Sequence, residues 1–138
     1  MLAKQAGDLL VELLDLFPTL ADLCGLAAPA GLEGRSFSPL LDKPDQSWKT
    51  AVFSVVLRGE LTDPINDLNP AHVGRSVRTE KWRFTQWWDG STQLYDHSND
   101  PREYVNLAGN PAHAAAVSEL RGLISNLVSG TGKGSAGK

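Results

Sequence analysis

The sequence of 138 residues has few of the features that mark common catalytic classes. It contains one cysteine, Cys24, so no disulfide can form within the chain, and cysteine usage gives no sign of an oxidising compartment. Its histidines, His72, His97 and His113, show no metal-ligand spacing with one another or with Cys24, which argues against a zinc site. Phosphate-binding glycine loops and a Gly-x-Ser-x-Gly nucleophile motif are also absent. The residues alone therefore reveal no catalytic machinery.

Clustered positive charge and long apolar runs are missing as well. The formal net charge is -3, and the 13 Lys and Arg residues are scattered, which argues against a nucleic acid or an anionic membrane as partner. No segment is long and apolar enough to span a bilayer. Asp8, Glu12 and Asp15 interrupt the opening residues, so these do not resemble a signal peptide. We expect any export signal to lie outside this sequence, and the compartment stays undetermined.

The composition is typical of one soluble globular domain, with 41% hydrophobic and 21% charged residues. The stretch Ser76–Trp88 holds three of the four tryptophans and predicts two strands joined by a turn at Glu80-Lys81. A third strand is expected at Gln93–His97. The β-branched segment Ala51–Leu57 predicts another strand, well buried because it shows little polar alternation.

The tryptophans of the hairpin allow two interpretations. Trp82, Phe84, Gln86 and Trp88 alternate with more polar residues, so one face of the strand is largely apolar. On this alternation Trp82 and Trp88 belong to the core and only Trp87 is exposed. The other interpretation is a platform of exposed indoles that stacks on a sugar.

The first part of the chain predicts a strand followed by a helix. Leu9–Leu14 is an apolar run that we interpret as a strand, and Asp15 before Leu-Phe-Pro is typical of a helix cap. The helix would span Leu16–Cys24 and end at Gly25. Its apolar face would consist of Leu16, Leu20, Leu23 and Cys24, which makes Cys24 a buried, inert thiol.

Two further helical segments follow. Ser36–Leu41 predicts one helical turn capped by Ser36, and Asn110-Pro111 opens a final helix with Asn110 as its cap. The final helix should cover the sheet with an apolar stripe formed by Val117, Leu120, Ile124 and Leu127. Residues Ser129–Lys138 are expected to be a disordered tail. The predicted fold class is α+β, a small antiparallel sheet of about four strands packed by a C-terminal helix.

The candidate binding residues surround a long loop, Gly59–Gly74. Arg58, His72 and Arg75 bracket this loop or lie in it, and cationic groups at a sheet end can hold a sulfate, a phosphate or a carboxylate. Trp87 is the candidate for stacking. Ordinary surface charge is the alternative interpretation of the three cations.

Asp96, Asp100 and Glu103 form an acidic cluster that invites a calcium interpretation. The cluster lacks the regular spacing and the glycine of a calcium-binding loop, so we interpret it as a solvated turn.

Four segments resemble a known family when they are taken in order. They are VELLDLFPTLADLCGL (11–26), GLEGRSFSPLL (31–41), VGRSVRTEKWRFTQW (73–87) and QLYDHSNDPREYVNLAGNP (93–111). Together they resemble the C-terminal part of sulfatases of the iduronate-2-sulfatase and choline-sulfatase type. The resemblance covers roughly residues 9–127, and four motifs in register are a specific signal.

The resemblance implies an alkaline-phosphatase-like enzyme with a large α/β domain and a smaller C-terminal subdomain. Residues 1–26 would be the last strand and helix of the large domain, 27–50 a connecting loop, 51–128 the subdomain and 129–138 the tail. Such sulfatases hydrolyse sulfate esters with a formylglycine made from a Cys/Ser-x-Pro/Ala-x-Arg motif, beside a calcium ion. Cys24 is followed by Gly-Leu-Ala-Ala and does not match this motif.

No catalytic or metal-binding residue of the family can be placed on this chain. We therefore expect it to bind neither cofactor itself, to be inactive alone, and to need the N-terminal catalytic domain and a sulfate ester substrate as partners. One alternative is a non-catalytic module that binds a sulfated glycan or a protein partner. Another is part of a related phosphonate or phosphate ester hydrolase.

Overall fold

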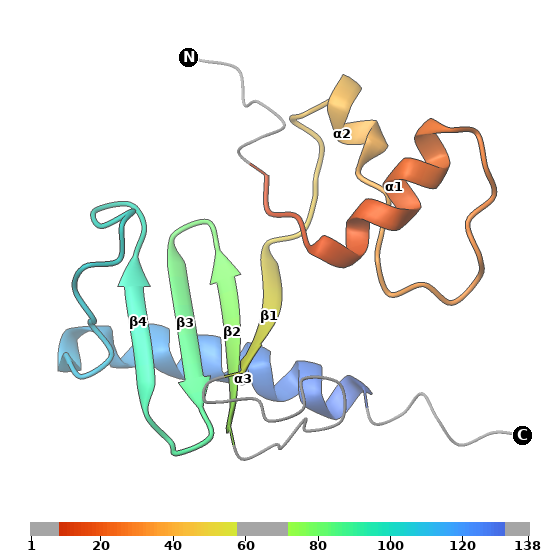
Figure 1. Ribbon diagram of the computed structural model, residues 1–138. Helices are drawn as coiled ribbons and strands as arrows, with labels where there is room; N and C mark the ends of the chain where they lie inside the picture. The colour runs from red at the N-terminus through yellow and green to blue at the C-terminus, as the bar shows by residue number, and fades with distance from the viewer. Residues whose placement is uncertain (1–8, 58–71, 132–138) are drawn as a thin grey trace, which may run out of the picture. The chain divides into compact units, whose positions relative to one another are not determined.

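The computed structural model describes residues 9–57 and 72–131 (Figure 1). The chain divides into two compact units, Met1–Val52 and Phe53–Lys138, and each is described by itself. The elements are the 3-10 turn η2 (Leu13–Asp15), helices α1 (Leu16–Leu23) and α2 (Ser38–Asp42), strands β1 (Ala51–Leu57), β2 (Val73–Thr79), β3 (Trp82–Trp87) and β4 (Thr92–Asp96), the 3-10 turn η4 (Pro111–His113) and helix α3 (Ala114–Thr131).

An antiparallel sheet of four strands, in the order β1-β2-β3-β4, forms the second unit. The register places Val77 of β2 opposite Phe84 of β3, and Phe84 opposite Leu94 of β4. All three side chains are fully buried, and α3, which crosses one face of the sheet in Figure 1, adds buried Leu120 and Ile124. The predicted sheet and its covering helix are confirmed, because alternation in the strands and the helical stripe place these side chains in one core.

Side chains close the predicted turn at Glu80-Lys81. The turn has no Gly or Asn, which a two-residue hairpin loop normally uses. Here the backbone N–H of Trp82 donates to Thr79 Oγ1 at 3.0 Å, and Arg78 Nη1 donates to the carbonyl of Glu80 at 3.0 Å. The side chains of the strand ends thus satisfy backbone groups of the turn, which lies where it was predicted. The outer ends of the hairpin differ from the prediction, since β2 begins at Val73 rather than Ser76 and β3 ends at Trp87 rather than Trp88.

Strand β1 is less buried than predicted. It lies at one end of the strand order, so among the described strands it pairs only with β2. Val55 is 66% exposed, and Ser54 and Val56 are exposed as well. The apolar run predicted a well-buried strand, and the strand is present, but the outcome of β propensity depends on whether a strand is central or at an edge.

The predicted strand at Leu9–Leu14 is wrong. The described residues before α1 form no strand, and Leu13–Asp15 instead form the 3-10 turn η2. The carboxylate of Asp15 is the reason, since it accepts the backbone N–H of Glu12 at 2.9 Å and that of Arg35 at 2.8 Å. It also accepts a hydrogen bond from Lys49 Nζ at 2.7 Å. The Asp15 side chain therefore makes no capping hydrogen bond to α1, contrary to the prediction.

Asp15 is fully buried, yet its charge is stabilised. Burial raises the pKa of this carboxyl, but the bonds from Lys49 and from the N–H groups of Arg35 and Glu12 outweigh burial, so the pKa lies below its usual value. Burial likewise lowers the pKa of Lys49, and its bonds to Asp15 and Glu12 more than reverse this. Through Lys49 and the N–H of Arg35, Asp15 joins three segments of the first unit.

Gly34 lets these segments meet. A Cβ atom at this position would stand 2.0 Å from the carbonyl oxygen of Leu14, which no side chain can accommodate. The next residue, Arg35, is the one whose N–H reaches Asp15. Gly25 ends α1 with φ of 66°, as its sequence position predicted.

The predicted helix caps and the predicted tail agree only in part with the structure. Ser36 does not cap α2 directly, since Phe37 occupies that position, but its hydroxyl accepts the N–H of Ser38 at 3.2 Å. Asn110 accepts the N–H of Ala112 at 3.0 Å, so the predicted cap is present, and η4 precedes α3. Helix α3 continues to Thr131, so the predicted tail begins too early. Its remaining residues lie outside the described part.

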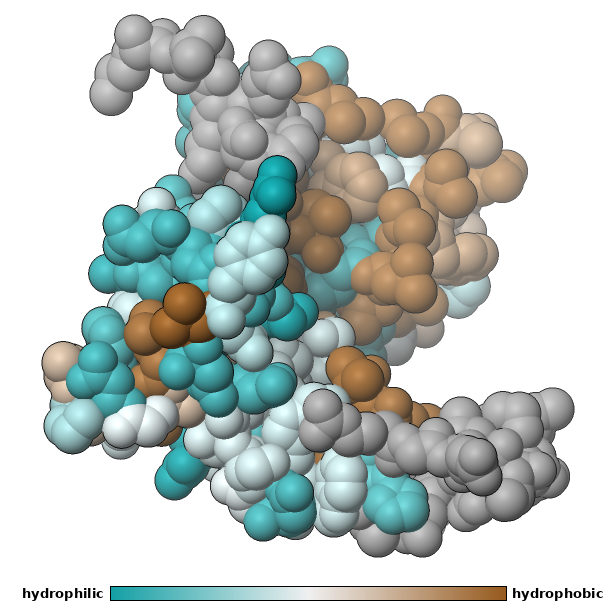
Figure 2. Space-filling model, turned by 60° about the vertical axis from the view of Figure 1, so that its left-hand side comes forward, coloured by the Kyte–Doolittle hydropathy of each residue, from teal (hydrophilic) through white to brown (hydrophobic). Residues whose placement is uncertain are grey.

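The first unit exposes several large apolar side chains. Cys24, which was predicted to be buried, is exposed as well. Figure 2 shows hydrophobic surface gathered on this unit. Its members on η2, on α1 and just after α1, here called the α1 apolar face, are Leu13, Leu16, Phe17, Leu20, Leu23 and Leu26. No helix in the described ranges is long and apolar enough to cross a membrane.

Candidate functional site

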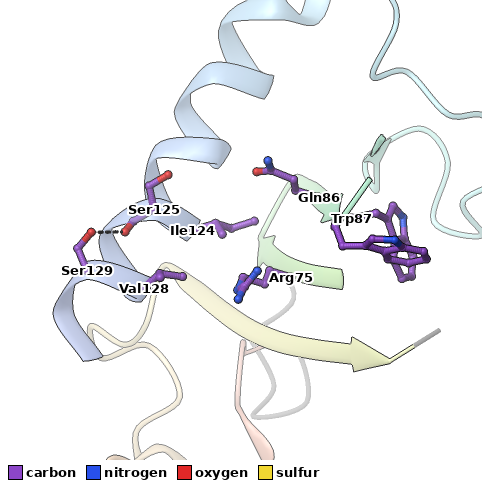
Figure 3. A pocket seen from close by; sticks show the side chains of 8 residues that line it. Arg75, Gln86, Trp87, Ile124, Ser125, Val128 and Ser129 are labelled. Atoms are coloured by element: carbon purple, nitrogen blue, oxygen red, sulfur yellow. Dashed lines mark hydrogen bonds between the residues drawn. The ribbon is translucent and has the colours of Figure 1, made fainter. Parts of the chain in front are cut away.

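Two of the residues predicted to bind ligand line one cleft of the second unit. Arg75 of β2 and Trp87 of β3 lie beside α3 in a cleft of about 440 Å³, a volume in the range of small-molecule sites. Figure 3 shows Arg75 and Gln86 extending from the sheet on the side where α3 presents Ile124 and Val128. We call this cleft the Arg75 cleft; its lining residues are Arg75, Gln86, Trp87, Trp88, Ile124, Ser125, Val128 and Ser129.

Arg75 supplies the positive charge of the cleft. Its side chain is exposed, and among the residues that the structure describes no carboxylate forms an ion pair with it. None of the lining residues is acidic. The side-chain amide of Gln86 likewise forms no hydrogen bond within the described ranges. The cleft therefore offers the five donors of one guanidinium and a neutral amide to a ligand.

A chain of aromatic rings brings His72 to the same place. The rings of Trp87 and Trp88 meet edge to face, with centroids 6.0 Å apart, and His72 meets Trp88 in the same way at 5.2 Å. Three of the four predicted residues, His72, Arg75 and Trp87, thus gather at the end of β2 and β3. The fourth, Arg58, lies outside the described residues.

The roles predicted for the tryptophans are partly wrong. Trp88, expected in the core, is 40% exposed, whereas Trp87 and Trp82 are half-buried. Trp88 follows the last residue of β3 and lies in a turn, so the alternation of the strand no longer applies to it. Trp87 is covered on one side because Gly74 lies opposite it in the register.

Both serines of the cleft donate a hydrogen bond to a backbone carbonyl of α3. Ser125 Oγ donates to the carbonyl of Arg121 at 3.0 Å, and Ser129 Oγ donates to the carbonyl of Ser125 at 2.9 Å (Figure 3). Each hydroxyl also has lone pairs that can accept a hydrogen bond, and it can rotate to donate one instead. The wall formed by α3 therefore carries hydroxyls of either role, beside the donors of Arg75.

Sequence reasoning missed Gln86, Trp88, Ser125 and Ser129 as lining residues. A signal for the serines was available in the sequence. Ser125 follows Ile124 of the apolar stripe, and Ser129 lies one helical turn after Ser125, so both stand beside the face that packs on the sheet.

The described residues do not fit the cofactors of a complete sulfatase. No group of three or more His, Cys, Asp or Glu side chains within residues 9–57 and 72–131 could hold a metal ion. Cys24 is followed by Gly-Leu-Ala-Ala rather than by the residues of a formylglycine motif. No catalytic step is therefore assigned to these residues.

Each carboxylate of the acidic turn has a local partner. Asp96 accepts the N–H of Ser98 at 3.0 Å, and Asp100 accepts that of Val105 at 2.8 Å. Glu103 pairs with His97 at 2.6 Å and with Arg83. Because these oxygens are directed to different donors, the turn holds its own loop together.

The sequence of almost the whole chain matches one family model. Residues 1–129 match the model described as N-sulphoglucosamine sulphohydrolase, C-terminal. The chain belongs to this sulfatase family. It is similar to a Δ4,5-hexuronate-2-O-sulfatase of Bacteroides thetaiotaomicron, with 34% identity over 130 residues that cover 91% of this chain and 25% of the relative. The chain thus spans about a quarter of the length of this sulfatase.

Solved structures support the same assignment. A 2-O GAG sulfatase matches with a TM-score of 0.69 and 29% identity, over 86% of this chain and 25% of that one. A phosphonate monoester hydrolase from Silicibacter pomeroyi matches with a TM-score of 0.65 and 28% identity, over 82% of this chain and 24% of that one. The predicted resemblance to the C-terminal part of sulfatases with an alkaline-phosphatase-like fold is confirmed.

Proposed function

We propose that the complete protein hydrolyses sulfate esters and that this sulfatase segment docks onto the catalytic part. The catalytic part would supply the formylglycine and the calcium ion, since the described residues fit neither. It would correspond to the three quarters of the Bacteroides relative that this chain does not match.

The α1 apolar face is the observation that carries this proposal. Leu13 is 85% exposed, and Leu20 and Leu23 are each 59% exposed on one short helix. Contiguous exposed apolar surface of this kind marks a protein interface. The buried Asp15–Lys49 pair holds the face in a fixed shape, so it is ready to pack without reorganisation.

We also propose how the segment is divided. Residues 1–26 would complete the large domain, 27–50 would connect, and the C-terminal subdomain would begin at residue 51 and extend through α3 to Thr131. The separation of compact units after Val52 supports a boundary near the start of β1.

The substrate would lie near His72, Arg75 and Trp87, and Arg58, which lies outside the described residues, is the fourth candidate to contact it. The positive charge and the aromatic surface at the Arg75 cleft support this placement of the substrate.

The test produces the two parts as separate chains in the same cells. The catalytic part of the Bacteroides relative, without its own C-terminal segment, is purified by a tag, and the amount of this chain that it retains is measured. We expect retention and release of sulfate from a Δ4,5-hexuronate 2-O-sulfate. Leu20→Asp should reduce both at least ten-fold, whereas Val105→Asp, which changes an exposed apolar residue of the other unit, should not.

Equal losses for the two variants, or equal activity of the catalytic part alone, would contradict the proposal. A phosphonate monoester is assayed in parallel, because the fold is shared with a phosphonate monoester hydrolase. Preference for that ester would assign the complete protein to the alternative class.

A further inference from the structure

We infer that the face of the sheet opposite α3 is a second docking surface for the catalytic part of the complete protein, which presents a carboxylate to Arg83 there. The inference rests on the proposed function for the presence of a catalytic part. It adds a surface on the second unit, with a stated chemistry of the partner, whereas the α1 apolar face belongs to the first unit.

The strand register defines this surface. Val77, Phe84 and Leu94 lie in the core, so their strand neighbours point to the opposite face of the sheet. Helix α3 is the only α-helix that the structure describes in this unit, and it packs on the core side (Figure 1). We call the opposite surface the outer face; its two cross-strand rows are Ser76, Thr85 and Gln93, and Arg78, Arg83 and Tyr95.

The outer face is polar, yet it is largely shielded from water. Ser76 and Thr85 are only 6% and 5% exposed, and the hydroxyl of Thr85 donates to Ser76 Oγ at 3.0 Å. The other four members of the two rows are half-buried. Antiparallel sheets commonly leave one face in water with its polar side chains exposed. The shielding seen here instead suits a face that packs against protein.

Arg83 is the charged centre of the outer face. Its guanidinium lies over the ring of Tyr95, 5.7 Å from the centroid, and pairs with Glu103. Its Nε is buried and has no hydrogen-bond partner among the described residues, although the side chain as a whole is 42% exposed. Glu103 therefore does not saturate this guanidinium, and the exposed part can take a second carboxylate.

Positive charge exceeds negative charge on this surface. Arg78 stands directly opposite Arg83 in the register, so two guanidinium groups lie side by side. Glu103 is the one carboxylate that pairs with either of them in the described ranges, and it also bonds His97 Nε2 at 2.6 Å. Burial lowers the pKa of Arg78, although Glu103 opposes this, so water screens the two charges only in part. Like charges held together in a shielded layer favour a partner that brings negative charge.

The surface is held in shape before a partner arrives. Glu103 adopts a φ of 59°, which a residue other than glycine keeps only when its contacts enforce it. Its carboxylate bonds both Arg83 and His97. In the same loop Asp100 accepts the N–H of Val105 at 2.8 Å. A surface preformed in this way binds without a large ordering cost.

The catalytic part is the occupant that accounts for a shielded face on this unit. The chain spans a quarter of the Bacteroides sulfatase, so three quarters of such an enzyme lie outside it. The chain divides into two compact units after Val52, and a contact at the α1 apolar face alone would leave the second unit free to move. A carboxylate of the catalytic part that pairs with Arg83 would fix its position.

The experiment compares the 138-residue chain with a fused chain, in which the catalytic part of the Bacteroides relative carries this chain in place of its own C-terminal segment. Both are treated with phenylglyoxal, which modifies accessible arginine side chains, and each site is followed by mass spectrometry. Arg83 should react about ten-fold more slowly in the fused chain, because the docked carboxylate covers it. Arg121, exposed on α3 at the other side of the sheet, is the control and should react equally in both.

Variants separate docking from internal stability in the two-chain retention test. Arg83→Gln should lower retention about ten-fold or more, the usual effect of removing one partner of an interfacial charge pair. Arg121→Gln, an equal change of charge outside the outer face, should leave retention unchanged. Glu103→Gln breaks the same internal ion pair but keeps the guanidinium, so it should also leave retention unchanged. Dispersed tryptophan indole N–H signals in NMR spectra verify that the sheet of each variant is folded.

Four outcomes would overturn the inference. The first is equal reactivity of Arg83 in both chains, and the second is an equal effect of Arg83→Gln and Glu103→Gln on retention. The third is protection of Arg83 in the 138-residue chain by sodium sulfate to the extent seen in the fused chain, which would assign the face to a small anion. The fourth is protection that rises with the concentration of the 138-residue chain, which would assign the face to a second copy.

The same fused chain separates this inference from the proposed function. An active fused chain in which Arg83 stays accessible would support the function and contradict the docking surface. An inactive fused chain that protects Arg83 would do the reverse.

Discussion

The indole ring of Trp87 on β3 fills the space that a side chain at Gly74 on β2 would occupy. They face each other in the register, and a Cβ atom on Gly74 would stand 2.6 Å from Cε3 and Cζ3 of the indole. The missing side chain at residue 74 is therefore what allows the Trp87 ring to lie where it lines the Arg75 cleft. The position of a glycine thus sets the shape of the cleft.

Replacing Gly74 with Ala should displace the Trp87 ring and destabilise the second unit by about 1–3 kcal/mol, the usual cost of overpacking. Chemical denaturation measures the loss, and the Trp87 indole signal should shift. Gly122→Ala on α3 is the control, because a Cβ there meets nothing within 4 Å. It should be neutral or stabilising. An unshifted Trp87 signal in Gly74→Ala would contradict the packing described.

The core of the second unit predicts unequal costs for two aromatic residues. Phe84 is fully buried between Val77 and Leu94, so Phe84→Ala should cost about 3–5 kcal/mol. Trp82 is half-buried and contacts His113 and Lys81 at the edge of the core, so Trp82→Ala should cost less. Urea unfolding of the two variants decides the order. A larger loss for Trp82→Ala would mean that the core is centred elsewhere.

Asp15 should be the most sensitive polar residue of the first unit. Asp15→Asn leaves Lys49 without its buried partner and turns an amide N–H₂ group toward existing donors. We expect a loss of about 3 kcal/mol, the lower end for a broken buried pair, because Lys49 keeps part of its exposure. Hydrogen exchange at the Glu12 and Arg35 amides reports this loss. Asp45→Asn, on the exposed surface, is the control and should leave the exchange rates unchanged.

The same pair predicts how the first unit responds to pH. The pKa of Asp15 is lowered in the folded state, so its contribution is present above about pH 4 and is lost as pH falls through the folded pKa. The pKa of Lys49 is raised, so its contribution is full below about pH 10 and is lost as pH rises through the folded pKa. Exchange protection should show a plateau between these limits. In Asp15→Asn the acid limb should flatten, and an unchanged acid limb would assign it to other carboxylates.

The parts of the fold that the sequence predicted well depend on short-range patterns. The hairpin of β2 and β3 and the stripe of α3 could be predicted because each pattern repeats within one element. Asp15 was assigned a local role, whereas its partners Arg35 and Lys49 are 20 and 34 residues away. No local pattern carries such a contact.

The candidate site shows the same limit. His72, Arg75 and Trp87 could be selected by residue type, but the wall that α3 provides depends on how the helix crosses the sheet. Trp88 was assigned to the core because alternation was extended one residue past the end of β3. The exposure of Cys24 was missed because the residue was assigned to the apolar face of the helix, whereas α1 ends at Leu23 and Cys24 is its C-cap.

Activity of a fused chain tests the central claim most directly. The catalytic part of the Bacteroides relative is joined to this chain in place of its own C-terminal segment, and release of sulfate from a Δ4,5-hexuronate 2-O-sulfate is measured beside the two parts alone. We predict turnover by the fused chain and none above background by either part. Sulfate release by the 138-residue chain alone, or a folded but inactive fusion, would contradict the account.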